Sequence, residues 1–530
     1  MKKIFSIFSI LLLMSCADEV LNINDNPNLA TEAELNLLLT GAEATAGFWT
    51  NRTANEDAMI LSRQLYRLAP SQYSIGPDNI NNDFDNLYSR VLKEFQRIID
   101  QGTEEERFGL VGISQVYKAY IFGLMVDLWG DIPYSDALNG ETNISPEFED
   151  DKVIYDKLLL LLDEAKGNLD TGIANNEVVS GDIVMNGSLS AYKKVANTVK
   201  LRLLLNLRLT EPARATTEIN ALIAENNFID DNNENFVFRY GTAISPLNQN
   251  PIYQQDYTGS GNKTFYMDNY FMYKMHSRND PRMRYYFNRQ GDNTELDFET
   301  TPCSNRTDCV YAVLLLNDPT ADGLIGRDHG DPSGIPSDNT IRTSWGVYPI
   351  GGIYDDGSKT DATLGAGANG GGIMPWLIAA NTKFMLAEAA LQLGTTGDPE
   401  LLFSQGMNLS IEYVYNMGNQ MAATAPAPND ATIQAAKTTY INDRVAAYQA
   451  ASNNGKLNLI IEEKFAAQFG NGFDSYTDLR RTGSPNDLPL SLVPLAPFLN
   501  RMPYGRSELV TNPNAPNPAP LNSEKVFWDN

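Results

Sequence analysis

The chain contains few of the residues on which metal-dependent and nucleophilic catalysis most often depend. Of its 530 residues only three are cysteines and two are histidines, His276 and His329. Neither histidine lies in an H-E-x-x-H motif, and the chain has no G-x-S-x-G motif, the patterns typical of zinc proteases and serine hydrolases. We therefore expect no catalytic residue, no cofactor and no metal.

Basic residues are scarce relative to acidic ones. The chain has 40 Lys and Arg against 66 Asp and Glu, which gives a formal net charge of −26. Nucleic-acid binding needs clustered basic side chains that displace counterions, so the charge argues against such a partner. It also argues against electrostatic adhesion to anionic lipid. An acidic surface instead favours solubility.

Long hydrophobic runs are missing as well. After residue 16 no stretch approaches the ~20 apolar residues of a membrane-spanning helix. The longest candidate, Leu201 to Leu209, is interrupted by two arginines and an asparagine. The N-terminus itself has two lysines and then an apolar run of about eleven residues, too short to span a bilayer but typical of a secretory signal.

Cys16 ends this N-terminal segment. It follows Leu13-Met14-Ser15, which resembles a bacterial lipobox, and the resemblance implies cleavage before Cys16 and acylation of the new terminus. Two or more acyl chains would anchor the protein stably. Ala17 rather than Asp follows, so a simple inner-membrane retention signal is absent. The alternative is an ordinary signal peptide with an incidental cysteine.

The two remaining cysteines, Cys303 and Cys309, are six positions apart in a polar segment with turn-forming residues. In an oxidising compartment we expect them to form a disulfide. The loop is short, so the bond would shape the loop more than it stabilises the fold.

Hydrophobic periodicity divides the chain into regions. Residues 1–15 are read as a signal peptide and the Asn/Asp-rich residues 16–35 as a flexible tether. A single mostly α-helical domain is expected over 36–530, with helical hairpins resembling tetratricopeptide repeats over 36–225. An irregular, ligand-facing region with short strands follows over 226–375, and helices with an extended tail occupy 376–530. The helices are expected at 84–99, 109–128, 153–169, 188–209, 376–393, 401–420, 432–451 and 457–469, and β-like pieces at 236–238 and 309–315.

Several motifs together resemble the SusD/RagB family of outer-membrane lipoproteins of Bacteroidetes-type bacteria. The segment from Ile461 to Gly483 is similar to the family's C-terminal signature of a Glu-rich helix, a Gly-aromatic turn, Asp-Leu-Arg-Arg and a Gly. It departs in having Glu462-Glu463-Lys464 where many members have Glu-Arg. The other matching motifs are Trp129–Tyr134, Asp280–Met283, Ala387–Ala390, Arg501–Tyr504 with Glu508, and Asn512–Asn514. We expect Asp478, Arg480 and Arg481 to form ion pairs or to cap carbonyls near the core.

The resemblance implies a cell-surface protein that binds glycans and delivers them to a SusC-like TonB-dependent transporter in the outer membrane. Such binding needs aromatic faces for the sugar rings and polar groups for the hydroxyls. Loop residues are the natural candidates. The aromatic candidates are Trp345, Tyr348, Trp376, Tyr354, Tyr73 and Trp49, and the amide candidates are Asn79 and Asn82. For Trp345 the alternative is a place in the core of the loop, and for Trp376 it is a packing contact at the start of a helix.

Other interpretations remain open. A surface glycoside hydrolase would use paired carboxylates, which a chain this acidic does not reveal by pattern. Some relatives of the family handle peptides rather than sugars. Among glycans, the negative charge disfavours strongly anionic polysaccharides. We expect a neutral glucan such as a laminarin-type β-glucan, with a starch-like glucan as the alternative. The acidic run at Asp328–Asp331 with Asp338 has oxygens suited to Ca²⁺ but lacks EF-hand spacing. Residues 365–370 fit G-x-G-x-x-G without a preceding apolar strand, which favours a flexible loop.

Overall fold

The computed structural model describes residues 34–67, 75–257, 265–336, 342–493, 498–520 and 522–529. In the N-terminal part the elements are α2 (Leu35–Trp49), α3 (Thr53–Leu61), β1 (Leu65–Tyr66), α4 (Pro77–Asn86), the π-helix η1 (Leu87–Leu92), α5 (Lys93–Glu104), α6 (Phe108–Trp129), β2 (Ile132–Pro133), η2 (Gly140–Thr142), β3 (Phe148–Glu149), α7 (Asp151–Ala174), α8 (Leu189–Asn206) and α9 (Pro212–Glu225). Cys16 and Tyr73 lie outside the described residues.

Shorter elements follow, and then the C-terminal helices. The short ones are η3 (Asn232–Glu234), β4 (Phe236–Arg239), α10 (Pro251–Asp256), β5 (Tyr266–Met267), α11 (Asn269–Ser277), α12 (Met283–Tyr286), β6 (Phe287–Asn288), η4 (Asn293–Glu295), α13 (Tyr311–Asn317), η5 (Pro319–Ala321), β7 (Ser344–Trp345) and β8 (Ile373–Leu377). The C-terminal helices are α14 (Ala379–Leu393), α15 (Pro399–Met421), α16 (Ala431–Ala450), α17 (Asn453–Ala467), α18 (Gly472–Thr482) and α19 (Arg506–Thr511).

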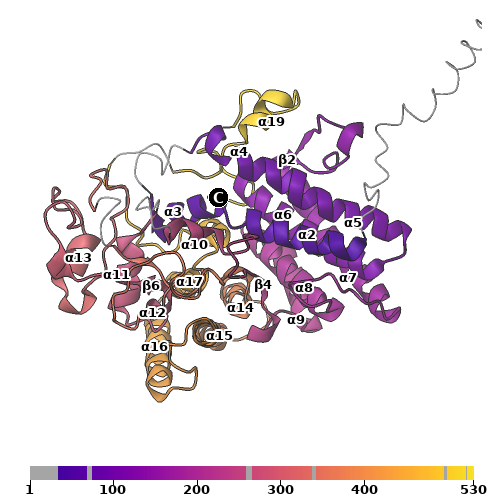
Figure 1. Ribbon diagram of the computed structural model, residues 1–530. Coiled ribbons are helices and arrows are strands. Elements are labelled where there is room, and N and C mark those ends of the chain that lie inside the picture. The colour runs from indigo at the N-terminus through magenta and orange to yellow at the C-terminus, as the bar shows by residue number, and fades with distance from the viewer. Residues whose placement is uncertain are drawn as a thin grey trace, which may run out of the picture.

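Helices α2 and α5 to α9 pack into one half of the molecule, on the right in Figure 1, around α6. Nearly every residue of α6 is buried, because the helix is apolar on all sides and neighbours surround it. A Cβ on Gly172 would lie 2.8 Å from the Gly109 Cα, so two glycines let α6 and α7 approach closely. These antiparallel helices support the predicted helical scaffold.

Helix α6 also corrects one expectation. It is long and apolar enough to cross a membrane, whereas we expected no such stretch after the signal. Its apolar window is 94% buried inside the fold, which is typical of a central core helix. The sequence pattern did not identify this helix as an apolar stretch because single polar residues interrupt it.

The other half of the molecule has its own hydrophobic cluster, built from the middle region and helices α14, α15 and α17. Phe469, which follows α17, is at its centre. The rings of Phe271, Tyr286, Phe287 and Trp345 lie 4.5–5.9 Å from it, centroid to centroid. The described residues of the irregular region 226–375 are therefore packed against the C-terminal helices.

Strands in the described residues pair only as four two-stranded antiparallel sheets: β1–β5, β2–β3, β4–β8 and β6–β7. Most join segments far apart in the chain. In the longest pair, Phe236 lies opposite Leu377 and Arg239 opposite Ile373. Each of these sheets thus connects two loop segments by main-chain pairing and does not form a separate layer.

Most predicted helices are confirmed, and Ser188 caps α8 by accepting a hydrogen bond from the Ala191 N–H. Two local predictions are wrong. Residues 309–315 are not a strand, because the Asp328 carboxylate accepts the N–H groups of Val310, Tyr311 and Ala312 and starts α13 there. Trp376 lies in β8 and not in a helix, because β4 pairs with it.

The family-like C-terminal signature has a structural role. Arg481 is fully buried and forms ion pairs with Glu388 and Asp478. Arg480 donates to the main-chain oxygens of Asn500 and Asp127. The predicted ion pairs and carbonyl caps are thus confirmed for these side chains.

Candidate functional site

Four of the predicted platform aromatics are buried core residues, which corrects our expectation of projecting rings. Trp345 is fully buried, stacked 4.5 Å from Phe469. Tyr348 is fully buried, stacked 5.4 Å from Tyr286. The neighbouring Gly346 suggested a loose loop, but a Cβ there would lie 2.2 Å from the Tyr285 carbonyl oxygen. The glycine therefore permits tight packing.

Trp376 and Tyr354 are also buried. The Trp376 ring lies 4.8 Å from Phe236, and its Nε1–H donates to Thr50 Oγ1 at 2.8 Å. The Tyr354 ring lies 4.9 Å from Tyr285. None of these rings offers a free face for stacking in this structure.

The remaining described candidates, Trp49, Asn79 and Asn82, are at least partly exposed. Trp49 ends α2 and meets Phe48 edge-on, with ring centroids 5.2 Å apart. Phe48 is 39% exposed, and the Arg52 guanidinium lies 5.0 Å from its ring centroid. The result is an accessible pair of rings with a cation beside it.

Asn79 and Asn82 lie three residues apart on α4, so they share one helix face. The Asn79 side chain accepts the Gly76 N–H at 2.9 Å and so fixes the start of α4. The Ala54 N–H donates to Asp83 Oδ1 at 3.2 Å, which ties the α2–α3 turn to α4. We call Phe48, Trp49, Arg52, Asn79 and Asn82 the α2–α4 surface.

Three carboxylates lie buried beneath this surface. Burial, reinforced by the neighbouring Asp57, raises the pKa of Glu56 to about 7. Burial likewise raises the pKa of Asp57 and of Asp83 to about 6, although an ion pair with Arg67 opposes the shift at Asp57. The Gln255 amide donates to Glu56 Oε1 at 3.1 Å. The protein beneath the α2–α4 surface therefore contains polar groups that bind protons near neutral pH.

The α2–α4 surface combines rings for stacking with amide and guanidinium groups for hydrogen bonds. This combination suits a ligand with both apolar faces and hydroxyl groups. Sequence reasoning missed Phe48 and Arg52. The available signal was two adjacent aromatics at a helix end with an arginine three residues later.

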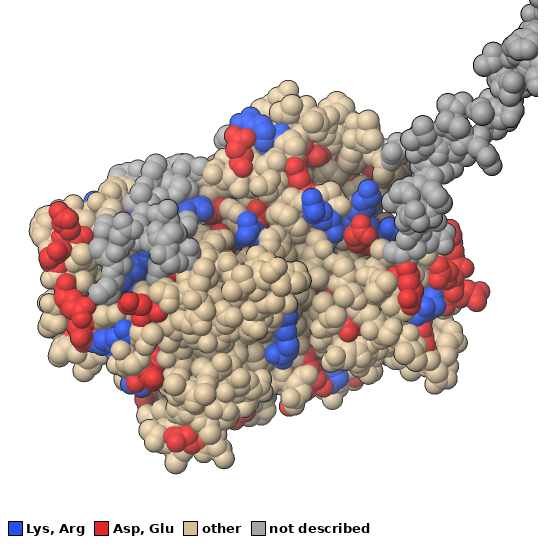
Figure 2. Space-filling view, viewed as in Figure 1, with Lys and Arg blue, Asp and Glu red and all other residues tan. Residues whose placement is uncertain are grey.

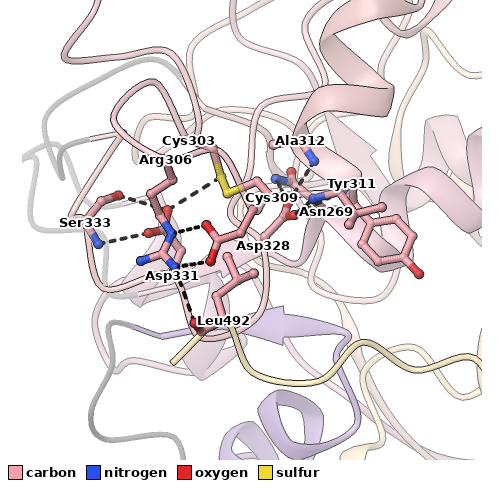
Figure 3. The surroundings of a disulfide bond; sticks show 12 residues. Asn269, Cys303, Arg306, Cys309, Tyr311, Ala312, Asp328, Asp331, Ser333 and Leu492 are labelled. Atoms are coloured by element: carbon pink, nitrogen blue, oxygen red, sulfur yellow. Dashed lines mark hydrogen bonds and ion pairs between the residues drawn. A yellow bond between two sulfur atoms is a disulfide. The ribbon is translucent and has the colours of Figure 1, made fainter. Parts of the chain in front are cut away.

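The predicted disulfide between Cys303 and Cys309 is present (Figure 3). Cys303 Sγ lies 3.9 Å from Asp331 Oδ2, and Arg306 forms an ion pair with Asp308 and donates to the Leu492 carbonyl oxygen. The bond therefore holds a loop that also meets the segment near Leu492.

Asp328 and Asp331, which were considered as Ca²⁺ ligands, accept hydrogen bonds from nearby residues. Both oxygens of Asp328 accept N–H groups at the start of α13, and Oδ1 also accepts the Asn269 amide. Asp331 accepts the N–H and the hydroxyl of Ser333; Asp338 lies outside the described residues. A second group of acidic residues, Asp131, Asp150 and Asp151, lies at the start of helix α7. There Asp150 accepts the Val153 N–H, and Asp131 accepts the Asp151 N–H.

The fold is mostly helical, and the α2–α4 surface at its helix ends is a candidate binding surface. The sequence profile of a family described as "Starch-binding associating with outer membrane" matches residues 25–305, more than half of the chain. A second profile, "Susd and RagB outer membrane lipoprotein", matches residues 363–521. The chain belongs to the SusD/RagB family, as its motifs suggested, and its mostly helical fold is that of the family.

Solved structures share this fold at low sequence identity. A chitin-binding protein is 18% identical, with 94% of this chain and 100% of that chain covered and a TM-score of 0.71. A chitin-binding SusD homolog from Flavobacterium johnsoniae is 18% identical, with 93% and 97% covered and a TM-score of 0.66. A SusD/RagB family protein from Bacteroides thetaiotaomicron is 18% identical, with 94% and 99% covered and a TM-score of 0.67. No curated protein matches the chain.

Proposed function

We propose that this protein captures a neutral glycan at the cell surface and delivers it to a SusC-like TonB-dependent transporter, without cleaving it. Cys16 would carry the lipid anchor in the outer membrane, and the residues after it would form the tether. The observation that carries the proposal is the pair of partly exposed rings, Phe48 and Trp49, with the Arg52 guanidinium beside them, on a chain of this family.

The chemistry of the α2–α4 surface favours a sugar chain. Phe48 and Trp49 would bury the C–H face of a sugar ring, at about 25 cal/mol per Å² of apolar area. Asn79, Asn82 and Arg52 would meet hydroxyl groups, each neutral hydrogen bond adding about 0.5–1.5 kcal/mol. Affinity would therefore be modest for each sugar unit and would accumulate along a chain.

The charge distribution supports a neutral ligand. Figure 2 shows a broad central area with few charged side chains, and charged residues gathered toward both sides. A strongly anionic polysaccharide would meet a chain of net charge −26. Two solved relatives are named as chitin-binding, and chitin is also neutral and β-linked. A laminarin-type β-glucan and chitin oligosaccharides are the first ligands to test.

The test is affinity electrophoresis of the mature protein through gels that contain laminarin, glycol chitin or starch. We expect one of these polysaccharides to retard the protein, and Trp49→Ala to weaken the retardation about tenfold, the loss expected for one stacked ring. The matched control is Phe298→Ala, which removes a 65% exposed ring outside the α2–α4 surface.

Three outcomes would contradict the proposal. Equal loss in both variants would show that the α2–α4 surface is not the site. Retardation by no glycan, together with binding of a peptide library, would favour peptide cargo. Release of oligosaccharides during overnight incubation would show an enzyme.

A further inference from the structure

A cavity of about 500 Å³ opens at the surface beyond the α2–α4 surface. Its walls come from the end of α4, the π-helix η1, the segment around 133–146 and α19, and none of the five residues of the α2–α4 surface lines it. Helices α4 and α19 lie side by side at the top of Figure 1. The Ser507 hydroxyl on α19 joins them by donating to Asp85.

The π-helix is the first sign that this cavity has a function. It interrupts a continuous helical run from Pro77 to Glu104. Single π-helical turns are rare within α-helices and occur frequently at functional sites. Tyr88 and Ser89 of η1, and Lys93 directly after it, all line the cavity.

The lining provides an aromatic wall. The Tyr88 ring lies 5.3 Å from that of Phe84, and its hydroxyl donates to the Pro133 carbonyl oxygen at 2.7 Å. The ring is therefore fixed in place while remaining partly accessible. Ile144, which is 82% exposed, extends the apolar side at the rim.

The same cavity provides hydrogen-bonding groups. Asp85 and Glu508 contribute carboxyl oxygens, and burial, reinforced by Asp85, raises the pKa of Glu508. Within the part of the chain that the structure describes, the side chains of Ser89 and Lys93 have no hydrogen-bond or ion-pair partner. The lining can thus accept from hydroxyl groups and donate to them.

The volume of the cavity and the charges of its lining restrict the class of ligand that it can bind. The volume falls within the range of ~300–1,000 Å³ typical of small-molecule sites. Two carboxyl groups against one ammonium disfavour phosphates and anionic sugars. An aromatic wall opposite several hydroxyl-binding groups suits sugar rings better than a peptide, whose backbone would need a strand edge or a helix groove.

We propose that this cavity is a second glycan subsite, which binds a short stretch of neutral sugar units separately from the α2–α4 surface. The inference rests on the proposed function, since the ligand is the same class of glycan. Two subsites on one protein would raise its avidity for a long polysaccharide without raising its affinity for an oligosaccharide that fills only one of them.

The test compares Ser89→Trp with Val510→Trp in the mature protein. Ser89 is an exposed cavity-lining residue, so tryptophan there would fill the cavity from its mouth. Val510 is 72% exposed on α19 and does not line the cavity. With the polysaccharide that retards the wild type, we expect Ser89→Trp to lower the association constant about tenfold and Val510→Trp to leave it within about twofold.

A second measurement uses the unaltered protein. Binding of the polysaccharide should slow amide hydrogen exchange in residues 84–93 and 506–511 as well as around α2. Retardation of Ser89→Trp equal to wild type, or no added protection at 84–93, would overturn the second subsite while the proposed function stands. Wild type unretarded by every glycan would overturn both, and protection of 84–93 by peptides alone would make the cavity a peptide site.

Discussion

Two tryptophans of this protein differ in solvent exposure, and the packing around each side chain determines the difference. Trp49 ends a surface helix and keeps part of its ring in solvent. Trp345 has glycine and serine neighbours, yet it is fully buried against Phe469. Small neighbours allow a ring either to project or to be packed from all sides, so local composition did not distinguish the two.

Glu56 is the residue for which pH dependence is most clearly expected. Its pKa in the folded protein is about 7, above the ordinary 4.5, so folding takes up a proton between these two values. The free energy of unfolding therefore falls as pH rises from about 4.5 to about 7, and the full penalty is present above pH 7. Glu56→Gln should remove it and stabilise the protein by about 2–3 kcal/mol at pH 8.

Urea denaturation at pH 4 and pH 8 measures this effect. At pH 4 the two proteins should have nearly equal stability, because the carboxyl group is then largely protonated in both folded and unfolded chains. Glu104→Gln, an exposed change on α5, is the control and should show no such difference. A stabilisation by Glu56→Gln that is the same at both pH values would contradict a raised pKa.

At the scale of elements, the family-like signature works through close packing of helices. Gly472 begins α18, and a Cβ there would lie 2.3 Å from the Asn55 carbonyl oxygen and 2.6 Å from the Met59 nitrogen of α3. The Gly472 N–H also donates to Asn55 Oδ1 at 2.7 Å. The glycine in the signature is therefore needed because main chain meets main chain at this point.

Gly472→Ala should consequently destabilise the protein by about 2 kcal/mol or more, since neither helix can move without disturbing its neighbours. Because α3 carries Glu56 and supports the α2–α4 surface, glycan binding should weaken too. The control is Gly41→Ala in α2, where a Cβ would meet nothing within 4 Å. That change should stabilise the protein by about 0.5–1 kcal/mol. Thermal unfolding of both variants measures the two effects. An unchanged melting temperature of Gly472→Ala would contradict the packing argument.

At the scale of the whole molecule, the C-terminal tail packs against the N-terminal helices. Trp528 is fully buried, and its Nε1–H donates to Asp127 Oδ1 at 2.9 Å. Asp127 also forms an ion pair with Arg202, which reaches Asp474 in α18. One buried network thus joins α6, α8, α18 and the last residues of the chain.

Trp528→Ala should cost about 3–5 kcal/mol, the usual loss for removing a buried aromatic side chain. The Asp127 carboxylate would also lose a donor, which adds to the cost. Leu490→Ala, at an 87% exposed position, should change stability by less than about 0.5 kcal/mol. Chemical denaturation with both variants gives the comparison, and similar midpoints would mean that the tail is dispensable for stability.

The sequence by itself determined the family, the helical class and most helix positions, because periodic apolar residues and caps such as Ser188 act locally. It also identified the disulfide partners and the structural arginines of the signature. Trp49, Asn79 and Asn82 are at least partly exposed and stay predictions of ligand contact.

Only the tertiary structure decided which aromatics are buried and where the cavity lies. Trp345 and Tyr348 were assigned to the surface because of their Gly, Ser and Pro neighbours, and Trp376 because it follows a Gly-rich stretch. Two-stranded sheets and distant helices enclose all three rings. The cavity beside η1 is formed by segments more than 400 positions apart, from α4 to α19. Contacts at such separations leave no periodic signal in the sequence, because each depends on how the whole chain packs.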